Sequence, residues 1–197
     1  MSKITIFIVG ALLVLGMIGC NGYNGMVGKD NNVQKLWADV QTQYQRRNDL
    51  IGSLVKTVQG AADFEKGTLT AVIEARASAT QVKLDAKDLT PENMAKFQAA
   101  QDQLSGSLSR LLVSVEQYPN LKSNENFMNL QAELAGTENR IAVSRKDFNG
   151  GVGDYNLSVR SFPNNILANI FGFAAKGFFQ ASEKSQSAPD INFDFKK

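Results

Sequence analysis

The sequence predicts an all-α fold, an antiparallel bundle of long helices behind an N-terminal signal or membrane-anchor segment. Three observations lead to this prediction. An apolar run from Ile4 to Ile18 follows a single positive charge, Lys3. Beyond it, apolar residues recur at steps of four and three, the period of a helix face that packs against other helices. Prolines and capping residues separate these periodic segments, and the short connection near Pro119 makes the helices that it joins antiparallel neighbours.

The N-terminal segment, residues 1–19, has the parts of a secretory signal: a positive charge, an apolar stretch and the small residue Gly19 before the cut. The four residues that end at Cys20, Met-Ile-Gly-Cys, look like a bacterial lipobox, which predicts that Cys20 is lipidated and begins the mature chain. The alternative is an uncleaved transmembrane anchor, for which the run to Ile18 is short because a span needs about 20 apolar residues. Both alternatives leave the rest of the chain outside the cytoplasm, in the periplasm or at the cell surface.

The composition excludes several classes of function. Lys and Arg number 21 against 19 Asp and Glu, so the chain has no basic field that could hold nucleic acid. Histidine is absent, which excludes Ser-His-Asp and Cys-His catalysis and His-ligated metal sites. Cys20 is the only thiol, so an exported form has no intramolecular disulfide. We therefore predict no metal, no cofactor and no catalytic residue, and we expect a protein that is not an enzyme.

Residues 20–32 are expected to be a linker, and residues 33–179 a single helical domain. Its first helix is predicted to begin after an Asn32 cap and to end near residues 83–86, with Gly67 as a place where it could kink or break. The apolar face of this helix is formed by Val33, Trp37, Val40, Tyr44, Ile51, Leu54, Val58, Ala61, Leu69 and Val72.

Two more long helices follow. Thr90, Pro91 and Glu92 together predict a helix start, since they supply a cap, a proline in the first position and an acid near the positive end of the helix dipole. Pro119 ends this second helix, and Ser123 is expected to cap the third. The third helix is expected to fray or bend, rather than end, at three late glycines: Gly150, Gly151 and Gly153.

An apolar segment follows Phe162-Pro163, and it has two interpretations. It is either a last short helix that covers the end of the bundle or an exposed patch that contacts a membrane or a partner. Residues 180–197 are polar and are predicted to form a disordered tail. Within this tail, residues 191–195 alternate like a strand.

Two charged residues fall on the packing face of the first helix: Arg47 lies between Tyr44 and Ile51, and Glu65 follows Ala61. A lone buried charge is costly, so each residue needs a partner on a neighbouring helix. The candidate partners are Glu116, Glu133 and Glu138 for Arg47, and Arg76 and Arg140 for Glu65. Such pairs either fix the register of the helices or line a polar pocket that binds a small ligand.

A series of motifs runs in order along the chain: Tyr23-Asn24, Gln45-Arg46-Arg47-Asn48-Asp49-Leu50-Ile51, Glu116-Gln117-Tyr118-Pro119-Asn120-Leu121-Lys122, Thr137-Glu138-Asn139-Arg140-Ile141 and Tyr155-Asn156. Through these motifs the chain resembles the LemA family. The resemblance implies an N-terminal membrane anchor and a bundle of long antiparallel helices outside the cytoplasm, with no established enzymatic activity, cofactor or catalytic residue. The chain departs from the family pattern at Gly52, where the family has proline, and at Phe64, where it has histidine.

Two classes of function follow from these observations. The preferred one is a membrane-anchored scaffold or interaction protein of the bacterial cell envelope, whose partner is another envelope protein. The alternative is an envelope enzyme or ligand-binding subunit that uses carboxylates and Arg inside the bundle. It requires several acids that converge on one cavity.

Overall fold

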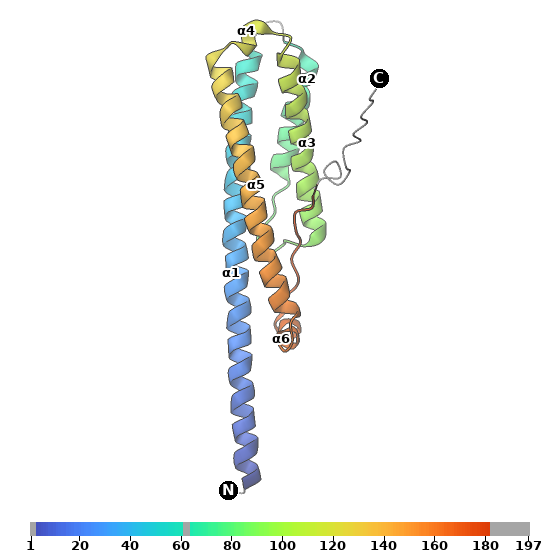
Figure 1. Cartoon of the computed structure of the whole chain (residues 1–197). Helices are drawn as coiled ribbons and strands as arrows, with labels where there is room; N and C mark the ends of the chain where they lie inside the picture. Colours follow the sequence, from blue (N-terminus) through green and yellow to red (C-terminus); the bar gives the residue numbers. More distant parts are fainter. Residues whose placement is uncertain (1–2, 61–63, 182–197) are drawn as a thin grey trace, which may run out of the picture.

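The computed structural model describes residues 3–60 and 64–181. Within these ranges the chain forms α-helices and no strand, which confirms the predicted all-α fold. The helices are α1 (Lys3–Gln59), α2 (Lys66–Gln81), α3 (Pro91–Val115), α4 (Pro119–Lys122), α5 (Glu125–Arg160) and α6 (Asn164–Phe171). Successive long helices run in opposite directions, α4 lies at the end of the bundle away from the N-terminus, and α6 lies near the opposite end (Figure 1).

Helix α1 is a single 57-residue helix, about 85 Å long at 1.5 Å per residue. It passes without a break through residues 20–32, where the sequence predicts a linker and an Asn32 cap. The helix continues there because it packs against the rest of the bundle: Met26 and Val33 are fully buried. The first part of α1 extends beyond the other helices (Figure 1). We call residues 3–18 the stalk.

The chain reverses direction after α1, so the single first helix predicted to reach residues 83–86 is wrong. The break lies between Gln59 and Lys66, just before Gly67, where the sequence allows one. Reversal lets Leu69 and Val72 of α2 join the same apolar cluster as the second half of α1. A straight continuation would leave these side chains without such a partner surface, at a cost in apolar burial.

The ends of the later helices follow local chemistry. Thr90 caps α3 as predicted, with its Oγ1 accepting a hydrogen bond from the Asn93 N–H at 3.2 Å. The cap of α5 is Asn124, one residue beyond the predicted Ser123, and its Oδ1 accepts from the Phe127 N–H at 3.1 Å. Helix α5 then continues through its three late glycines as far as Arg160.

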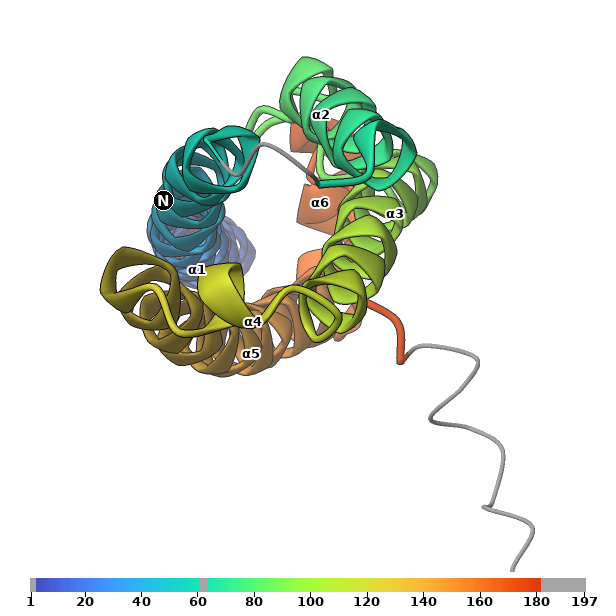
Figure 2. The same cartoon turned by 90° about the horizontal axis from the view of Figure 1, so that it is seen from above.

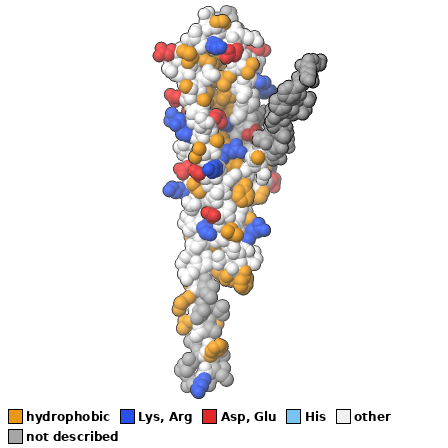
Figure 3. Space-filling model, in the orientation of Figure 1, with side chains coloured by type: hydrophobic (Ala, Val, Ile, Leu, Met, Phe, Trp, Pro, Cys, Tyr) orange, Lys and Arg blue, Asp and Glu red, His pale blue; other side chains and the backbone are white. Residues whose placement is uncertain are grey.

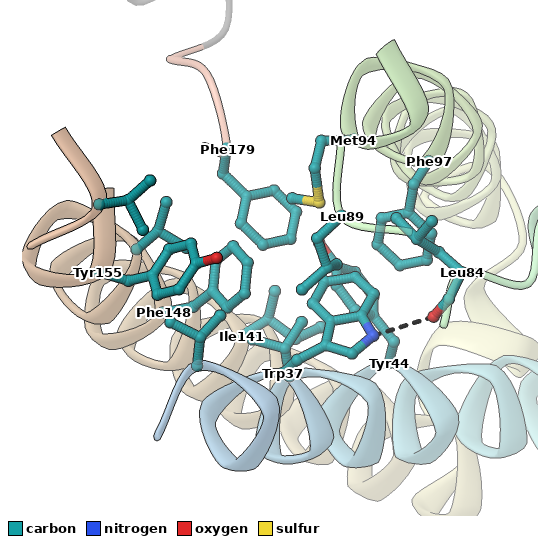
Figure 4. Close-up of a cluster of buried hydrophobic side chains, with 14 of the residues drawn as sticks. Trp37, Tyr44, Leu84, Leu89, Met94, Phe97, Ile141, Phe148, Tyr155 and Phe179 are labelled. Atoms are coloured by element: carbon teal, nitrogen blue, oxygen red, sulfur yellow. Dashed lines mark hydrogen bonds between the residues drawn. The ribbon is translucent and has the colours of Figure 1, made fainter. Parts of the chain in front are cut away.

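Two apolar clusters fill the bundle, and Figure 2 shows the long helices arranged in a ring around them. The cluster nearer the stalk is centred on Trp37 (Figure 4). The rings of Phe97, Phe148 and Phe179 surround it, with centroids 5.3, 5.4 and 6.2 Å away. Trp37 Nε1 donates to the carbonyl of Leu84 at 2.9 Å, which fixes the connection between α2 and α3. The second cluster lies toward α4 and joins side chains of all four long helices.

An extended segment, residues 172–181, follows α6 and returns along α3 and α5. We call it the strap. Gly172, with φ 76°, ends α6 in the left-handed conformation that favours glycine. Three side-chain amides each donate to the carbonyl and accept from the N–H of one strap residue, at 2.8 to 3.0 Å: Asn156 on Lys176, Asn149 on Phe179 and Gln98 on Gln180. These amides supply the backbone partners that a neighbouring strand would otherwise provide.

The strap changes the predicted boundary of the C-terminal tail. Gln180, the first residue of the predicted disordered segment, is hydrogen-bonded to Gln98 through both backbone groups. Residues 182–197 of the predicted tail, with the alternating stretch 191–195, lie outside the described residues.

Candidate functional site

A polar layer lies between the two apolar clusters, and Arg47 of α1 is at its centre. The side chain of Arg47 is 2% exposed. Its Nη1 donates to Ser105 Oγ at 3.0 Å and to Glu138 Oε1 at 3.3 Å, and its Nη2 donates to Gln101 Oε1. The guanidinium also lies over the ring of Tyr44, 4.9 Å from the centroid. One cation therefore joins α1, α3 and α5.

The layer forms because polar residues interrupt apolar helix faces at one level. On α1, Arg47 stands between the buried residues Tyr44 and Ile51, and on α3 the buried Gln101 interrupts the apolar stripe in the same way. Glu138 is different, since its side chain is 41% exposed and its carboxylate reaches the layer from the bundle surface. The buried end of this ion pair is thus the cation, and the anion keeps part of its solvation.

Helix α2 is tied to this region by Arg76. Its Nε donates to the backbone carbonyl of Asn48 at 2.9 Å. Gly52 leaves room for the guanidinium, because a Cβ at this position would lie 3.0 Å from Arg76 Nη2. Two buried atoms, Arg47 Nε and Asn48 Oδ1, have no hydrogen-bond partner among the described residues. The hydrogen bonds around Arg47 therefore leave part of the buried polar layer unsatisfied.

Glu65 and its predicted partners do not meet, which corrects the pairing expected from the sequence. Glu65 is exposed just before α2, and its carboxylate accepts from Thr68 Oγ1 at 3.3 Å. The chain turns between α1 and α2, so Glu65 is not on the packing face that the extended first helix would have given it. Arg76 contacts Asn48 instead, and Arg140 is exposed on α5.

Two other candidate partners of Arg47 lie elsewhere as well. Glu133 pairs with Arg46 at 3.3 Å, and both side chains are 53% exposed. Glu116 pairs with Lys122 beside α4. Adjacent arginines thus pair with two acids of α5, Arg47 from inside the bundle and Arg46 on its surface. Gln101 and Ser105 are partners that the sequence analysis missed, although Gln101 is the one polar member of its predicted stripe.

The chemistry available in the layer is limited. It contains one carboxylate, and the described residues hold no group of three acidic, His or Cys side chains that could bind a metal ion. Burial raises the pKa of the Tyr44 phenol, although Arg145 and Arg47 act to lower it, so this phenol is not prepared to act as a base. The arrangement suits the alignment of three helices.

The stalk end of the bundle carries the other candidate site. Exposed Cys20, with Gly16, Gly19, Tyr23, Asn24, Leu167 and Phe171, lines an open cavity of about 350 Å³ between α1 and α6. The rings of Tyr23 and Phe171 meet edge to face, with centroids 4.9 Å apart. On the face shown in Figure 3, charged and apolar side chains are mixed over the body of the bundle, and an apolar patch lies at its lower end. Among the described residues, no helix has a stretch long and apolar enough to span a bilayer.

Comparison with known proteins gives consistent matches. The family model described as LemA family matches residues 36–193. Magnetosome protein MamQ 2 of Paramagnetospirillum magneticum is 26% identical over 175 residues, which cover 80% of this chain and 64% of that protein. Magnetosome protein MamQ of Magnetospirillum gryphiswaldense is 25% identical over 174 residues, with the same two shares. Protein LemA of Metamycoplasma hominis is 23% identical over 160 residues, 81% of this chain and 69% of that protein. The chain thus spans less than two thirds of the length of the MamQ relatives.

Proposed function

Because the chain belongs to the LemA family, we propose that it is a membrane-anchored scaffold or interaction protein of the cell envelope, with its bundle outside the cytoplasm. The observation that carries this proposal is the continuity of α1. One helix leads from the apolar run Ile4 to Ile18 into the core of the bundle. A bilayer that holds the stalk, or a lipid on Cys20, would therefore be joined to the whole bundle by one continuous helix.

The interior of the bundle supports a binding role more than a catalytic one. Two apolar clusters fill it, and the polar layer between them contains a single ion pair. An enzyme that works with carboxylates needs several acids around one cavity. Glu65, which the enzyme alternative requires there, is exposed outside the bundle. The names of the relatives also specify no reaction.

Two modes of anchoring are compatible with this proposal. In the first, Cys20 is lipidated after removal of residues 1–19, and Cys20 is exposed on α1 as that modification needs. In the second, residues 1–19 stay attached as an anchor. Intact-mass measurement of the membrane-extracted protein separates them. A mass that lacks residues 1–19 and includes diacylglycerol supports lipidation, and a mass that retains them without lipid excludes it.

Protease accessibility tests the location of the bundle. In spheroplasts, added protease is expected to degrade the bundle while a cytoplasmic marker protein stays intact. Protection of the bundle until the cells are lysed would contradict the proposed orientation. Recovery of the chain in the soluble fraction would contradict anchoring itself.

The proposed partner is tested by crosslinking in intact cells followed by mass spectrometry. We expect a reproducible crosslink between the bundle and one other envelope protein, lost when the N-terminal segment is removed and the bundle is no longer held at the membrane. Purified protein that turns over a substrate, with no such crosslink, would instead favour the enzyme alternative.

A further inference from the structure

Helix α6 has one apolar face toward the bundle and another toward solvent. Ala168 is buried, and Leu167 packs against the cluster around Trp37. On the opposite side, Ile166 and Ile170 lie four residues apart and are 52% and 68% exposed, and Phe162, just before the helix, is 82% exposed. Residues at this spacing lie on one face of a helix. The exposed face is what remains to be explained, because single exposed apolar residues are common but an aligned set is not.

The position of α6 along α1 is fixed by close contact. A Cβ at Gly22 would lie 2.5 Å from Asn164 Oδ1 and 3.1 Å from Leu167 Cδ1, so a larger residue here would require these two side chains to move. Gly22 is four residues beyond Ile18, where the apolar run of the stalk ends. At 1.5 Å per residue, α6 therefore lies about 6 Å above the end of that run.

The axis of α6 runs across the bundle, nearly perpendicular to α1 and α5. Figure 1 views α6 nearly along its own axis while α1 and α5 run in the plane of the picture, and Figure 2 shows it crossing beneath the bundle. If the stalk stands upright in a bilayer, α6 lies parallel to the bilayer surface.

The distribution of charge points to the same surface. No charged residue occurs from Ile4 to Gly28, or from Ser161 to Ala175, although these two segments are far apart in the sequence. They meet at the stalk end of the bundle, where α1 contacts α6. The residues that bound them on the bundle side are all basic: Lys29, Arg160 and Lys176. Lys176 is paired with Asp30, whereas Arg160 is exposed.

We propose that α6 is a second membrane contact, lying in the interface of the bilayer that holds the stalk, with Phe162, Ile166 and Ile170 among the acyl chains. This inference rests on the proposed anchoring of the stalk. Interfacial helices lie in the plane of the membrane with their apolar face buried at the boundary between headgroups and acyl chains. Since the axis of α6 lies about 6 Å above the end of the apolar run and a helix with its side chains has a radius of about 5–6 Å, α6 can bring an apolar face to that boundary. Arg160, which immediately precedes the α6 region, then lies near the anionic headgroups, which attract such residues. Two contacts, stalk and α6, prevent the bundle from tilting freely.

The experiment uses introduced tryptophans and lipids that quench their fluorescence. The full chain is synthesised in vitro with vesicles of phosphatidylethanolamine and phosphatidylglycerol that also contain phosphatidylcholine with brominated acyl chains. Ile170→Trp and Ile166→Trp place an indole on the exposed face of α6. Val143→Trp, at a 59% exposed site on α5, is the matched control, and Phe7→Trp reports on the stalk. Trp37 is buried in the bundle, so the unchanged chain supplies the background emission. Unaltered circular dichroism shows that each variant folds.

We expect brominated lipid to cause a strong loss of the added emission at positions 7, 166 and 170 and no loss at position 143. Quenching at position 7 without quenching at 166 and 170 would overturn the α6 contact and leave the anchor intact, and the face would then be free for a protein. No quenching at position 7 would refute insertion of the stalk and, with it, the α6 contact. Quenching at position 143 would show that the bundle lies flat on the bilayer, which contradicts the upright arrangement.

Discussion

Asn156 and Lys176 are joined by two hydrogen bonds: the Asn156 amide donates to the Lys176 carbonyl and accepts from its N–H, both at 2.8 Å. The side chain of Lys176 then pairs with Asp30 of α1 at 2.9 Å and donates to the carbonyl of Ala86 at 3.2 Å. One strap residue therefore connects α5, α1 and the segment before α3. This explains in structural terms why a Tyr155-Asn156 pair occurs at this level, since the Tyr155 hydroxyl also donates to the strap, at the carbonyl of Ala174.

We first predict that Asn156→Ala and Asn149→Ala each destabilise the protein by about 1–3 kcal/mol, because each leaves two backbone groups of the strap without partners. Urea unfolding measures the loss, and hydrogen exchange should become faster in residues 173–181. Asn139→Ala is the control, since Asn139 is exposed on the same helix. A change of less than about 0.5 kcal/mol is typical of such surface sites. Equal effects at Asn139 and Asn156 would contradict the role of the amide pair.

Gly177 is the place where the strap crosses the start of α3. A Cβ there would lie 2.7 Å from Pro91 Cα and 3.0 Å from the Thr90 carbonyl, and these backbone atoms cannot move aside easily. The Gly177 N–H also donates to the Leu89 carbonyl at 2.8 Å. We predict that Gly177→Ala displaces the strap and costs about 1–3 kcal/mol, as overpacking does. Loss of the buried environment of Phe179, seen by NMR of its ring, would accompany the change.

The control for this substitution is Gly153→Ala in α5, where an added Cβ meets nothing within 4 Å. Here alanine should stabilise the helix by about 0.5–1 kcal/mol. If both glycine substitutions raised the melting temperature, the close contact at Gly177 would be refuted.

Adjacent arginines allow a comparison of a buried and an exposed ion pair. Both pairs, Arg47 with Glu138 and Arg46 with Glu133, have nitrogen-oxygen distances of 3.3 Å. Arg47→Ala should cost about 2–4 kcal/mol, because Gln101 loses its partner and a cavity remains. Arg46→Ala should cost less than about 1 kcal/mol, as exposed pairs do. Chemical denaturation measures the loss of unfolding free energy in each variant. Similar losses in the two variants would exclude the polar layer as a source of stability.

Stability is expected to fall in alkaline solution through Tyr155. Burial, and then the negative charge of Asp30, raise its pKa from 10.0 to about 12. Above pH 10 the unfolded chain releases this proton while the folded chain still holds it, so the unfolded state is favoured progressively until the folded phenol ionises near pH 12. Below pH 10 the group makes no pH-dependent contribution. Urea unfolding across this range should show the decline, and Tyr155→Phe should reduce its slope.

Tyr44 provides the control, since burial raises its pKa too. Tyr155→Phe alone should therefore leave a residual alkaline slope, and the additional change Tyr44→Phe should remove more of it. An unchanged slope in the double variant would assign the alkaline loss to other groups.

The sequence predicts those parts of the fold that depend on local chemistry. The cap and proline at Thr90 and Pro91 begin α3 where expected, and the apolar period carries α5 through its glycines. The reversal between α1 and α2 was not predictable to the residue, because Gly52, Gly60 and Gly67 each weaken a helix in this stretch and each could have ended it. The wrong prediction of a linker at residues 20–32 also came from glycines. Packing of α1 against α5 and α6 outweighs the cost of these glycines to the helix.

The hydrogen-bond partners in the polar layer could not be predicted from the sequence either. The stripe shows that Arg47 faces inward, but Glu133 and Glu138 are both close enough on α5 to be reached from α1. Which acid meets which arginine depends on the rotation of α5 about its axis, and close contact at Gly151 sets how near the two helices lie. The strap has no apolar period at all, and amide side chains that recognise extended backbone leave no repeating signal in a sequence.

Because α1 is uninterrupted, the number of its residues sets both the distance between its two ends and the rotation of one end relative to the other. From Gly22, where α6 is seated, to Gln59 at the opposite tip, the helix covers about 55 Å. Each residue inserted between them would lift the tip by about 1.5 Å and turn it by about 100°. The direction in which the α4 end of the bundle faces is thus fixed relative to α6, and the insertion of one residue in this part of α1 would turn that end toward a different neighbour.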